Sequence, residues 1–300
     1  MMRGRSRANP PLILLYGGPG MPETGFFRFF NAPLEDVFTV VYWEQRGSGR
    51  SFARSIPASS MTVERFVADL DELVEVVRTR VGTDKVTILG HSWGSILGVL
   101  YSERFPEKVA AYVGVAQIGD WPAAEASSYE FAMAEAQRLR DRKALTKLRA
   151  IGPPPYDAKS LFTERTLLQR MDGQLNGRTL WTMARILGAT EVSLIDVPSI
   201  VRGFRFTLDA MWAETSALNL VARVPALQVP VFFFLARKDH WVPAETSIAY
   251  YDALTAPSKH LVWFDESGHE LFADEPEKFN ASMVGLVSSV VRRERERSAG

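Results

Sequence analysis

The 300-residue chain contains no cysteine. This absence excludes disulfide bonds, thiol catalysis and zinc sites built from cysteine. Only four histidines are present, and no two of them have the i, i+3 or i+4 spacing of paired ligands, so we expect no metal site and no cofactor. Acidic and basic side chains number 35 each, which leaves no electrostatic footprint for nucleic acid or an anionic membrane.

Long apolar runs are also missing from the chain. The longest runs, such as Val231–Ala236, fall far short of the roughly 20 residues that cross a bilayer. Residues 1–10 are basic, but too few apolar residues follow them to form a signal peptide. We therefore expect a cytoplasmic protein, in an oligomeric state that the sequence leaves open.

The chain does contain an apolar, strand-like run that leads into Gly90-His91-Ser92-Trp93-Gly94 and then into a helix-compatible segment. This order is typical of a nucleophile elbow, a sharp turn that holds a serine hydroxyl clear of the backbone. G-x-S-x-G alone is a weak signal, because glycine and serine also meet by chance. The alternative is a glycine-rich loop with a solvated serine.

A serine hydroxyl needs a base, and we expect that base to be His269. In this architecture the acid and then the histidine follow the serine, each on a loop after a later strand. His269 lies in such a loop, after an apolar run and before a helix. Of the other histidines, His260 opens a strand, His240 directly follows an aspartate, and His91 is directed away from Ser92 and packs.

The acid that orients this base is predicted to be Asp239, which ends the apolar run 231–235 through a short turn. Asp252 lies on an expected helix. Asp265 is too close to His269 along its loop to come from the preceding strand. The predicted catalytic set is therefore Ser92, Asp239 and His269.

The glycine loop, residues 16–20, follows a short apolar strand at 11–15. Acyl transfer builds negative charge on a carbonyl oxygen, and each backbone N–H aimed at that oxygen is worth about 3–4 kcal/mol. We expect the N–H of Trp93 to be one donor and the N–H of Gly18 to be the other. The alternative is an ordinary glycine turn.

Three segments together resemble those of proline iminopeptidases: Tyr16-Gly17-Gly18-Pro19-Gly20, Glu44-Gln45-Arg46-Gly47-Ser48-Gly49-Arg50-Ser51 and Gly90-His91-Ser92-Trp93-Gly94-Ser95. The resemblance covers roughly residues 10–118 and 222–292. It implies an α/β-hydrolase of the proline iminopeptidase-like group, which works through an acyl-enzyme. Such an enzyme would release N-terminal proline or a similar residue from small peptides or amides.

The chain also departs from that group. Tyr16 replaces the loop histidine, Glu44 replaces an aspartate, and His91 stands where iminopeptidases commonly carry glycine. The tryptophan–glutamate segment that helps those enzymes hold the substrate's amino group has only a loose counterpart in Trp212-Ala213-Glu214. A carboxylesterase on small acyl esters, and a non-catalytic member that binds a small ligand, therefore remain alternatives.

We expect Trp212 and Glu214 to face the substrate, with Glu214 as the carboxylate that pairs with a substrate ammonium. The segment around them is rich in glutamates, and most of these are expected on solvated helix faces. The glutamates in this segment include Glu125, Glu130, Glu135, Glu191 and Glu214.

Strand-like and helix-like segments alternate, which predicts an α/β fold with a mostly parallel sheet covered on both faces. One helix is expected over 62–81, begun by Thr62 and ended by Gly82, and another over 274–291. Only residues 1–10 precede the first predicted strand, so we expect no N-terminal hairpin and an exposed edge strand.

The alternation stops between residues 119 and 221. Helical segments are predicted there at 127–150, 161–171, 178–187 and 204–220. We interpret residues 119–221 as a helical cap inserted into a core of residues 1–118 and 222–300. The alternative is that these helices only pack on the core.

Overall fold

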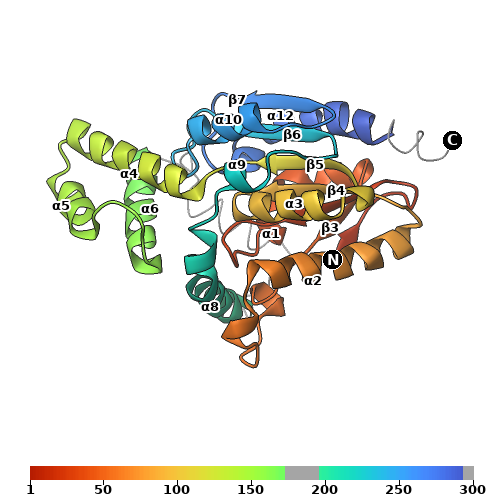
Figure 1. Ribbon diagram of the computed structural model, residues 1–300, viewed down its shortest axis with the longest axis horizontal. Coiled ribbons are helices and arrows are strands. Elements are labelled where there is room, and N and C mark those ends of the chain that lie inside the picture. The colour runs from red at the N-terminus through yellow and green to blue at the C-terminus, as the bar shows by residue number, and fades with distance from the viewer. Residues whose placement is uncertain (173–195, 293–300) are drawn as a thin grey trace.

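A seven-stranded sheet forms the centre of the computed structural model, which describes residues 1–172 and 196–292 (Figure 1). The strand order is β1-β3-β2-β4-β5-β6-β7. Neighbouring strands are parallel, except that β1 pairs with β3 in the antiparallel direction. The strands are β1 (Met2–Arg3), β2 (Pro11–Leu15), β3 (Thr39–Tyr42), β4 (Val86–His91), β5 (Val109–Val115), β6 (Val231–Ala236) and β7 (Lys259–Phe264). The expected mostly parallel sheet is present.

The inner strands are continuous apolar runs because a parallel sheet is buried on both faces. In β2, which reads PLILL, every residue is buried. Successive side chains point to opposite faces. Ile13 and Leu15 therefore pack in one hydrophobic core, and Leu12 and Leu14 pack in the other.

Helices cover both faces of the sheet. On one face lie α2 (Val63–Val81), α3 (Trp93–Arg104) and α10 (Ala244–Ala253). On the other lie α1 (Thr24–Asn31), α11 (Leu271–Asp274) and α12 (Pro276–Ser282). Phe66, Ile96 and Tyr250 are buried in the first core, and Phe27 and Phe272 in the second.

The predicted ends of α2 are confirmed. The Thr62 hydroxyl accepts a hydrogen bond from the N–H of Arg65 at 3.2 Å, and Gly82 has a left-handed φ of 70°. The last predicted helix begins at Pro276 and continues through a π-helical turn, η6 (Met283–Val287).

The edge of the sheet differs from the expectation. The two residues of β1 pair with Val40 and Val41 of β3, so β1 is the edge strand and covers part of β3. Strand β1 has no signal in the sequence, because two residues carry no periodicity. A very short edge strand presents few unpaired backbone groups to another chain.

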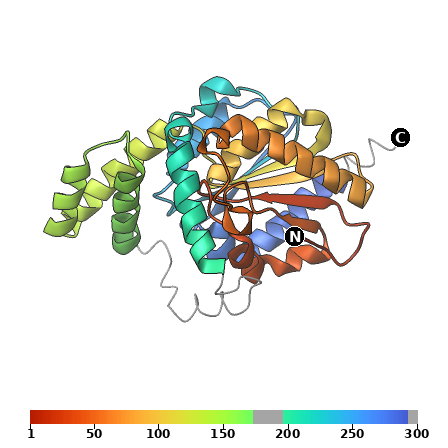
Figure 2. The same cartoon turned by 90° about the horizontal axis from the view of Figure 1, so that it is seen from below.

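The chain between β5 and β6 is helical. The described helices are α4 (Trp121–Arg138), α5 (Arg142–Ile151), α6 (Ala158–Asp172), α8 (Val197–Thr215) and α9 (Leu220–Arg223). The first three pack together as an arm that extends from the sheet, whereas α8 runs along the core (Figure 2). In the described part of the chain, no helix is long and apolar enough to span a membrane.

The single helix predicted over 127–150 is wrong, because the chain breaks it in two. Arg140 has a φ of 55°, a left-handed conformation that ends the first helix. The Asp141 carboxylate then accepts a hydrogen bond from the N–H of Ala144 at 2.9 Å and begins α5. The helix predicted over 178–187 lies outside the described residues.

Candidate active site

Ser92 lies at a sharp turn between β4 and α3. Its φ of 53° and ψ of −122° are rare for a residue with a side chain, and such strain clusters at functional sites. A Cβ at Gly90 would lie 2.3 Å from the carbonyl oxygen of Gly94, and one at Gly94 would lie 2.1 Å from that of Leu15. Only glycine fits at these two positions. The turn predicted between a strand and a helix is present.

His269 and Asp239 follow the carboxyl ends of β7 and β6. His269 Nδ1 lies 2.9 Å from Asp239 Oδ2, and both residues are buried. Asp239 Oδ1 accepts hydrogen bonds from the N–H groups of Trp241 and Val242, each at 2.9 Å. Burial opposes ionisation of Asp239, but His269 and these two N–H groups outweigh it and lower the pKa of the carboxyl below 3.8. Because Nδ1–H donates to this carboxylate, Nε2 of a neutral His269 is the proton acceptor.

Ser92 and His269 line one cavity of about 260 Å³. The glycine loop, the elbow and the loops after β6 and β7 form one side of it. Helices α4, α6 and α8 form the other. Its apolar wall includes Ile118, Trp121, Leu161, Phe162, Phe204 and Leu208. The arrangement suits a substrate whose reacting group meets Ser92 while the rest packs against apolar and aromatic side chains.

The two predicted oxyanion donors lie on segments that border this cavity. Gly18 lines it and has a φ of +120°, and a Cβ there would lie 2.5 Å from the nitrogen of Gly20. Trp93 is the first residue of α3, so its N–H is one of the helix donors without a partner inside the helix. The ring of Trp93 is fully buried in the core.

The buried side chain of Gln45 joins these two segments. Its Nε2 donates to the carbonyl oxygen of Tyr16 at 3.2 Å, and its Oε1 accepts from Trp93 Nε1 at 3.2 Å. Ser48 adds a hydrogen bond from its hydroxyl to the carbonyl oxygen of Gly20 at 2.9 Å. Residues 44–51 therefore hold the glycine loop against the start of α3, the helix that follows the elbow.

Trp212 and Glu214 have different surroundings, although both lie on α8. Trp212 lines the cavity, and its ring packs edge-to-face against Trp121 with 5.5 Å between ring centroids. Glu214 is exposed and accepts a hydrogen bond from the N–H of Val63 at 3.0 Å, at the start of α2. Two positions along a helix correspond to about 200° of rotation, so the two side chains leave opposite sides of α8. The prediction that Glu214 faces the cavity is wrong.

A different carboxylate, Glu125 on α4, does line the cavity. Its Oε1 accepts from Arg165 Nη2 at 2.5 Å and from Trp121 Nε1 at 3.1 Å, while Oε2 is buried without a hydrogen-bond partner among the residues that the structure describes. Arg165 also pairs with Glu164 at 2.7 Å. Burial raises the pKa of Glu125 to about 7. The charge of Arg165 lowers this pKa, and the charge of Glu164 raises it. Arg165 was not predicted from the sequence. Glu125 belongs to the glutamates expected mostly on solvated helix faces but is buried, and its i, i+4 spacing from Trp121 is the signal that could have identified it.

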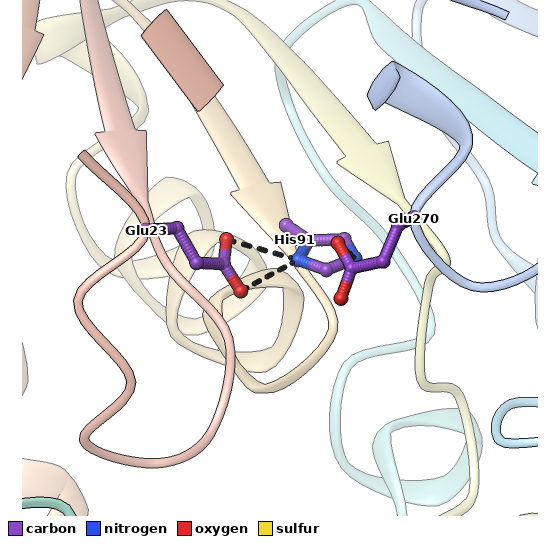
Figure 3. Close-up of side chains that lie close together, drawn as sticks. All are labelled: Glu23, His91 and Glu270. Carbon is purple, nitrogen blue, oxygen red and sulfur yellow. Dashed lines mark hydrogen bonds and ion pairs between the residues drawn. The ribbon is translucent and has the colours of Figure 1, made fainter. Parts of the chain in front are cut away.

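His91, at the end of β4, is buried between two carboxylates (Figure 3). Its Nδ1 lies 3.1 Å from both carboxylate oxygens of Glu23. Its Nε2 lies 3.1 Å from the carbonyl oxygen of His269 and 3.9 Å from Glu270 Oε2. Burial alone would lower the pKa of His91, but Glu23 and Glu270 outweigh it and raise this pKa to about 9.

The same three side chains place their ligand atoms within 4.8 Å of one another, a spacing that a metal ion can bridge. A metal-bound histidine must offer a lone pair on one ring nitrogen. Both nitrogens of His91 already face hydrogen-bond acceptors. Glu23, His91 and Glu270, hereafter the His91 cluster, therefore fit an ion cluster better than a metal site.

Comparisons with known proteins agree with this architecture. A family model described as alpha/beta hydrolase fold matches residues 10–276. The chain is 32% identical over 286 residues to the probable aminopeptidase YbaC of Bacillus subtilis (strain 168), which covers 93% of this chain and 89% of that protein. It is 39% identical over 103 residues to the proline iminopeptidase of Neisseria gonorrhoeae, which covers 34% of this chain and 31% of that protein.

Among solved structures, the proline iminopeptidase of Mycobacterium smegmatis matches with a TM-score of 0.66 at 19% identity, over 99% of this chain and 93% of that chain. At this identity the likeness concerns the fold alone. An esterase from Exiguobacterium antarcticum matches with a TM-score of 0.61 at 17% identity, over 97% of this chain and 93% of that chain.

The chain belongs to the alpha/beta hydrolase fold family, as the match over residues 10–276 and the parallel sheet show. Within that family it is a hydrolase of the proline iminopeptidase-like group, in keeping with its full-length and partial relatives. The predicted fold class and the prediction of an enzyme are confirmed. The non-catalytic alternative is set aside.

Proposed function

We propose that this hydrolase cleaves acyl bonds through Ser92, with His269 as base and then acid and with Asp239 as orienting acid. Ser92 Oγ attacks the substrate carbonyl carbon while its proton passes to His269 Nε2. His269 gives that proton to the leaving amine, and an ester to Ser92 remains. Water, losing a proton to His269, cleaves the ester, and Ser92 takes the proton back. The hydrogen bond between His269 and Asp239, beside a strained Ser92 on the same cavity, carries this proposal.

The carbonyl oxygen that becomes negative in each step is assigned to the N–H groups of Gly18 and Trp93. Donors fixed by the backbone need no reorganisation when charge develops, which is why each contributes about 3–4 kcal/mol. The two hydrogen bonds of Gln45 support this assignment, because they hold the glycine loop and the elbow helix together.

We further infer that the substrate carries a free amino group, as a short peptide or amide with N-terminal proline or a similar residue does. Glu125 lines the cavity, and its buried Oε2 lacks a hydrogen-bond partner in the described part of the chain. A buried acceptor without a donor is costly, and a substrate ammonium would supply one. Glu23 and Glu270 line the same cavity, and their two negative charges exceed the single charge of a protonated His91 between them. The relatives named aminopeptidase and proline iminopeptidase support this substrate class.

We also propose that residues 119–221 are a cap on a core of residues 1–118 and 222–300. Support comes from the wall of the cavity, where α4, α6 and α8 contribute Trp121, Phe162 and Leu208 opposite Ser92. Thr207 of α8 donates a hydrogen bond to the carbonyl oxygen of Gly47 at 3.1 Å, which connects the two parts.

Hydrolysis of small carboxylic esters is the second candidate, because much of the cavity wall is apolar. An ester also requires less help at its leaving group than an amide does. A paired assay separates the two activities: proline p-nitroanilide tests the aminopeptidase and p-nitrophenyl butyrate the esterase. Turnover of the ester without any turnover of the anilide would leave only the esterase.

The nucleophile is tested with Ser92→Ala and a fluorophosphonate probe. We expect the wild type to be labelled and Ser92→Ala to remain unlabelled, with kcat reduced by at least about 10⁴-fold. Equal labelling of both proteins would contradict the assignment.

The amine contact is tested with Glu125→Gln. Loss of the charge should raise KM for proline p-nitroanilide by about tenfold or more, because a hydrogen bond to a charged group is worth about 1.5–3 kcal/mol. The KM for p-nitrophenyl butyrate should not change. Glu130→Gln, an exposed position on the same helix, is the matched control. Equal effects of Glu125→Gln on both substrates would contradict the contact.

A further inference from the structure

The His91 cluster has no part in the proposed proton transfers, yet it contacts the loop that carries His269 (Figure 3). His91 lies next to Ser92 because both belong to the elbow, but its partners Glu23 and Glu270 come from two other loops. Glu23 precedes α1 and Glu270 precedes α11. His91 and Glu23 are only 2% and 6% exposed, so bulk water does not screen their charges.

The hydrogen bonds define the protonation of His91. Nε2 faces the carbonyl oxygen of His269, which has no proton to give, so Nε2 must carry one. Nδ1 faces both oxygens of Glu23, and the carboxylate Oε1 also accepts from the N–H of Gly17 at 3.2 Å. Next to an ionised Glu23, a neutral imidazole, which has one N–H, would satisfy only one of these contacts. An imidazolium satisfies both, and Glu270 adds a second negative charge 3.9 Å from Nε2.

We propose that His91 is a positioning residue, held as an imidazolium, that together with Glu23 ties the loop of His269 to the glycine loop. The connection runs from the N–H of Gly17 to Glu23, from Glu23 to His91, and from His91 to the carbonyl oxygen of His269. The inference rests on the proposed function, because it takes His269 as the base and Gly18 as an oxyanion donor.

Two anchors then hold His269. Asp239 binds the imidazole at Nδ1, and His91 binds the backbone carbonyl. The two imidazole rings also pack with 4.9 Å between their centroids, and Phe272 packs edge-to-face on His91 at 5.0 Å. A base that shifts by a fraction of an ångström loses rate rather than substrate affinity. The proposed role therefore acts on kcat.

The charged and titratable groups that face His91 are Glu23, Glu270 and the ring of His269. The two carboxylates keep the proton on His91 at neutral pH. When that proton is lost near pH 9, one of the two hydrogen bonds loses its donor, and the connection between the glycine loop and the loop of His269 is broken. The activity of the wild type should therefore fall as the pH rises through about 9.

Nitrogen-15 NMR of the histidine side chains tests the protonation directly, since the chain has only four histidines. The spectrum of His91→Gln identifies the His91 signals by their loss. At neutral pH we expect both ring nitrogens of His91 to carry protons. A neutral tautomer of His91 at neutral pH would overturn the proposal.

The positioning role is tested by the rate of fluorophosphonate labelling and by turnover of p-nitrophenyl butyrate, a neutral substrate that does not depend on Glu125. His91→Gln should lower both rates about 10- to 100-fold without a change in KM, and should lose the decline near pH 9. Glu23→Gln, which keeps the shape of the cluster, should move that decline to lower pH. His260→Gln, at a residue of β7 that stacks on Phe232, is the matched control. It should change neither the two rates nor the decline near pH 9.

Wild-type kcat and an unchanged alkaline decline in both His91→Gln and Glu23→Gln would overturn the positioning role. If the wild type is not labelled at Ser92, the proposed function fails, and the positioning role with it. The NMR spectrum decides the protonation of His91 in either case. If His91→Gln does not fold, Glu23→Gln and the pH dependence of the wild type decide the role.

Discussion

At the scale of single residues, two aspartates compete for the role of orienting acid. Asp239 is buried and bonded to His269 Nδ1, whereas Asp265 is exposed and pairs with Arg237 and Lys278. Asp239→Asn should lower kcat by about 10⁴-fold, because the amide no longer favours the tautomer with its proton on Nδ1. Asp265→Asn is the matched control and should retain most of the activity. The reverse order, measured on p-nitrophenyl butyrate, would assign the acid to Asp265.

The His91 cluster also makes stability depend on pH. Folding raises the pKa of His91 from 6.5 to about 9, so its contribution is complete below pH 6.5 and disappears as the pH rises towards 9. A shift of this size corresponds to roughly 3 kcal/mol. Urea unfolding across this interval should show a falling free energy in the wild type and a smaller fall in His91→Gln. Identical pH dependence of the two proteins would contradict the shift.

Residue positions were predictable where each follows a strand in a fixed order. Ser92, Asp239 and His269 could be selected in this way. The ion pairs of the His91 cluster could not be predicted, because the residues that form them lie far apart in the chain. Glu23 and His91 are separated by 68 positions. Only the folded sheet brings Glu23, just before α1, next to His91 at the end of β4.

At the scale of elements, α8 contributes to both the cavity and the core. Its Glu214 carboxylate lies at the N-terminus of α2, where a negative charge complements the helix dipole. Glu214→Gln should lower the free energy of unfolding by about 0.5 kcal/mol and leave KM for proline p-nitroanilide unchanged. Chemical denaturation and steady-state kinetics measure the two effects. An increase in KM would return Glu214 to the substrate site.

The close approach of α8 to the core occurs at Gly203. A Cβ there would lie 2.5 Å from the carbonyl oxygen of Gly47 and 3.0 Å from the Phe52 Cβ. Gly203→Ala should therefore push α8 outward, cost about 1–3 kcal/mol of stability and raise KM, since Leu208 and Trp212 of this helix line the cavity.

Gly285→Ala is the matched control, because nothing lies within 4 Å of a Cβ at that position. It should leave stability and KM near the wild-type values. Equal stability of Gly203→Ala and Gly285→Ala would contradict the tight contact.

Elements with clear end signals were predicted best. Helix α2 has both a Thr62 cap and a Gly82 terminator, and both operate as expected. The break at Arg140 was missed because arginine is an ordinary helix residue, and its left-handed φ has no marker in the sequence. Strand β1 was missed because pairing with β3, rather than composition, makes it a strand.

At the scale of the whole molecule, balance in total charge coexists with a local cluster of charged side chains. The 35 acidic and 35 basic side chains cancel, yet the cavity gathers three carboxylates, Glu23, Glu125 and Glu270, beside the basic side chains of His91 and Arg165. The overall composition did not predict that these charged side chains gather in one cavity. The mostly parallel sheet with helices on both faces followed from the alternation of strands and helices, whereas the strand order required the structure. The position of each helix between β5 and β6 required the structure.

The raised pKa of Glu125 would couple the proposed binding of an amine substrate to proton release. Below pH 7 this carboxyl is mostly protonated in the free enzyme, and an ammonium ligand would stabilise its ionised form. Binding must then expel a proton to the buffer, and by linkage the affinity must rise with pH until Glu125 is fully ionised. Calorimetry of Ser92→Ala with proline amide, in buffers of different ionisation enthalpy, would count that proton. Glu125→Gln should bind proline amide more weakly and release no proton. Specificity for the amine and sensitivity to acid would then both come from the Glu125 carboxyl.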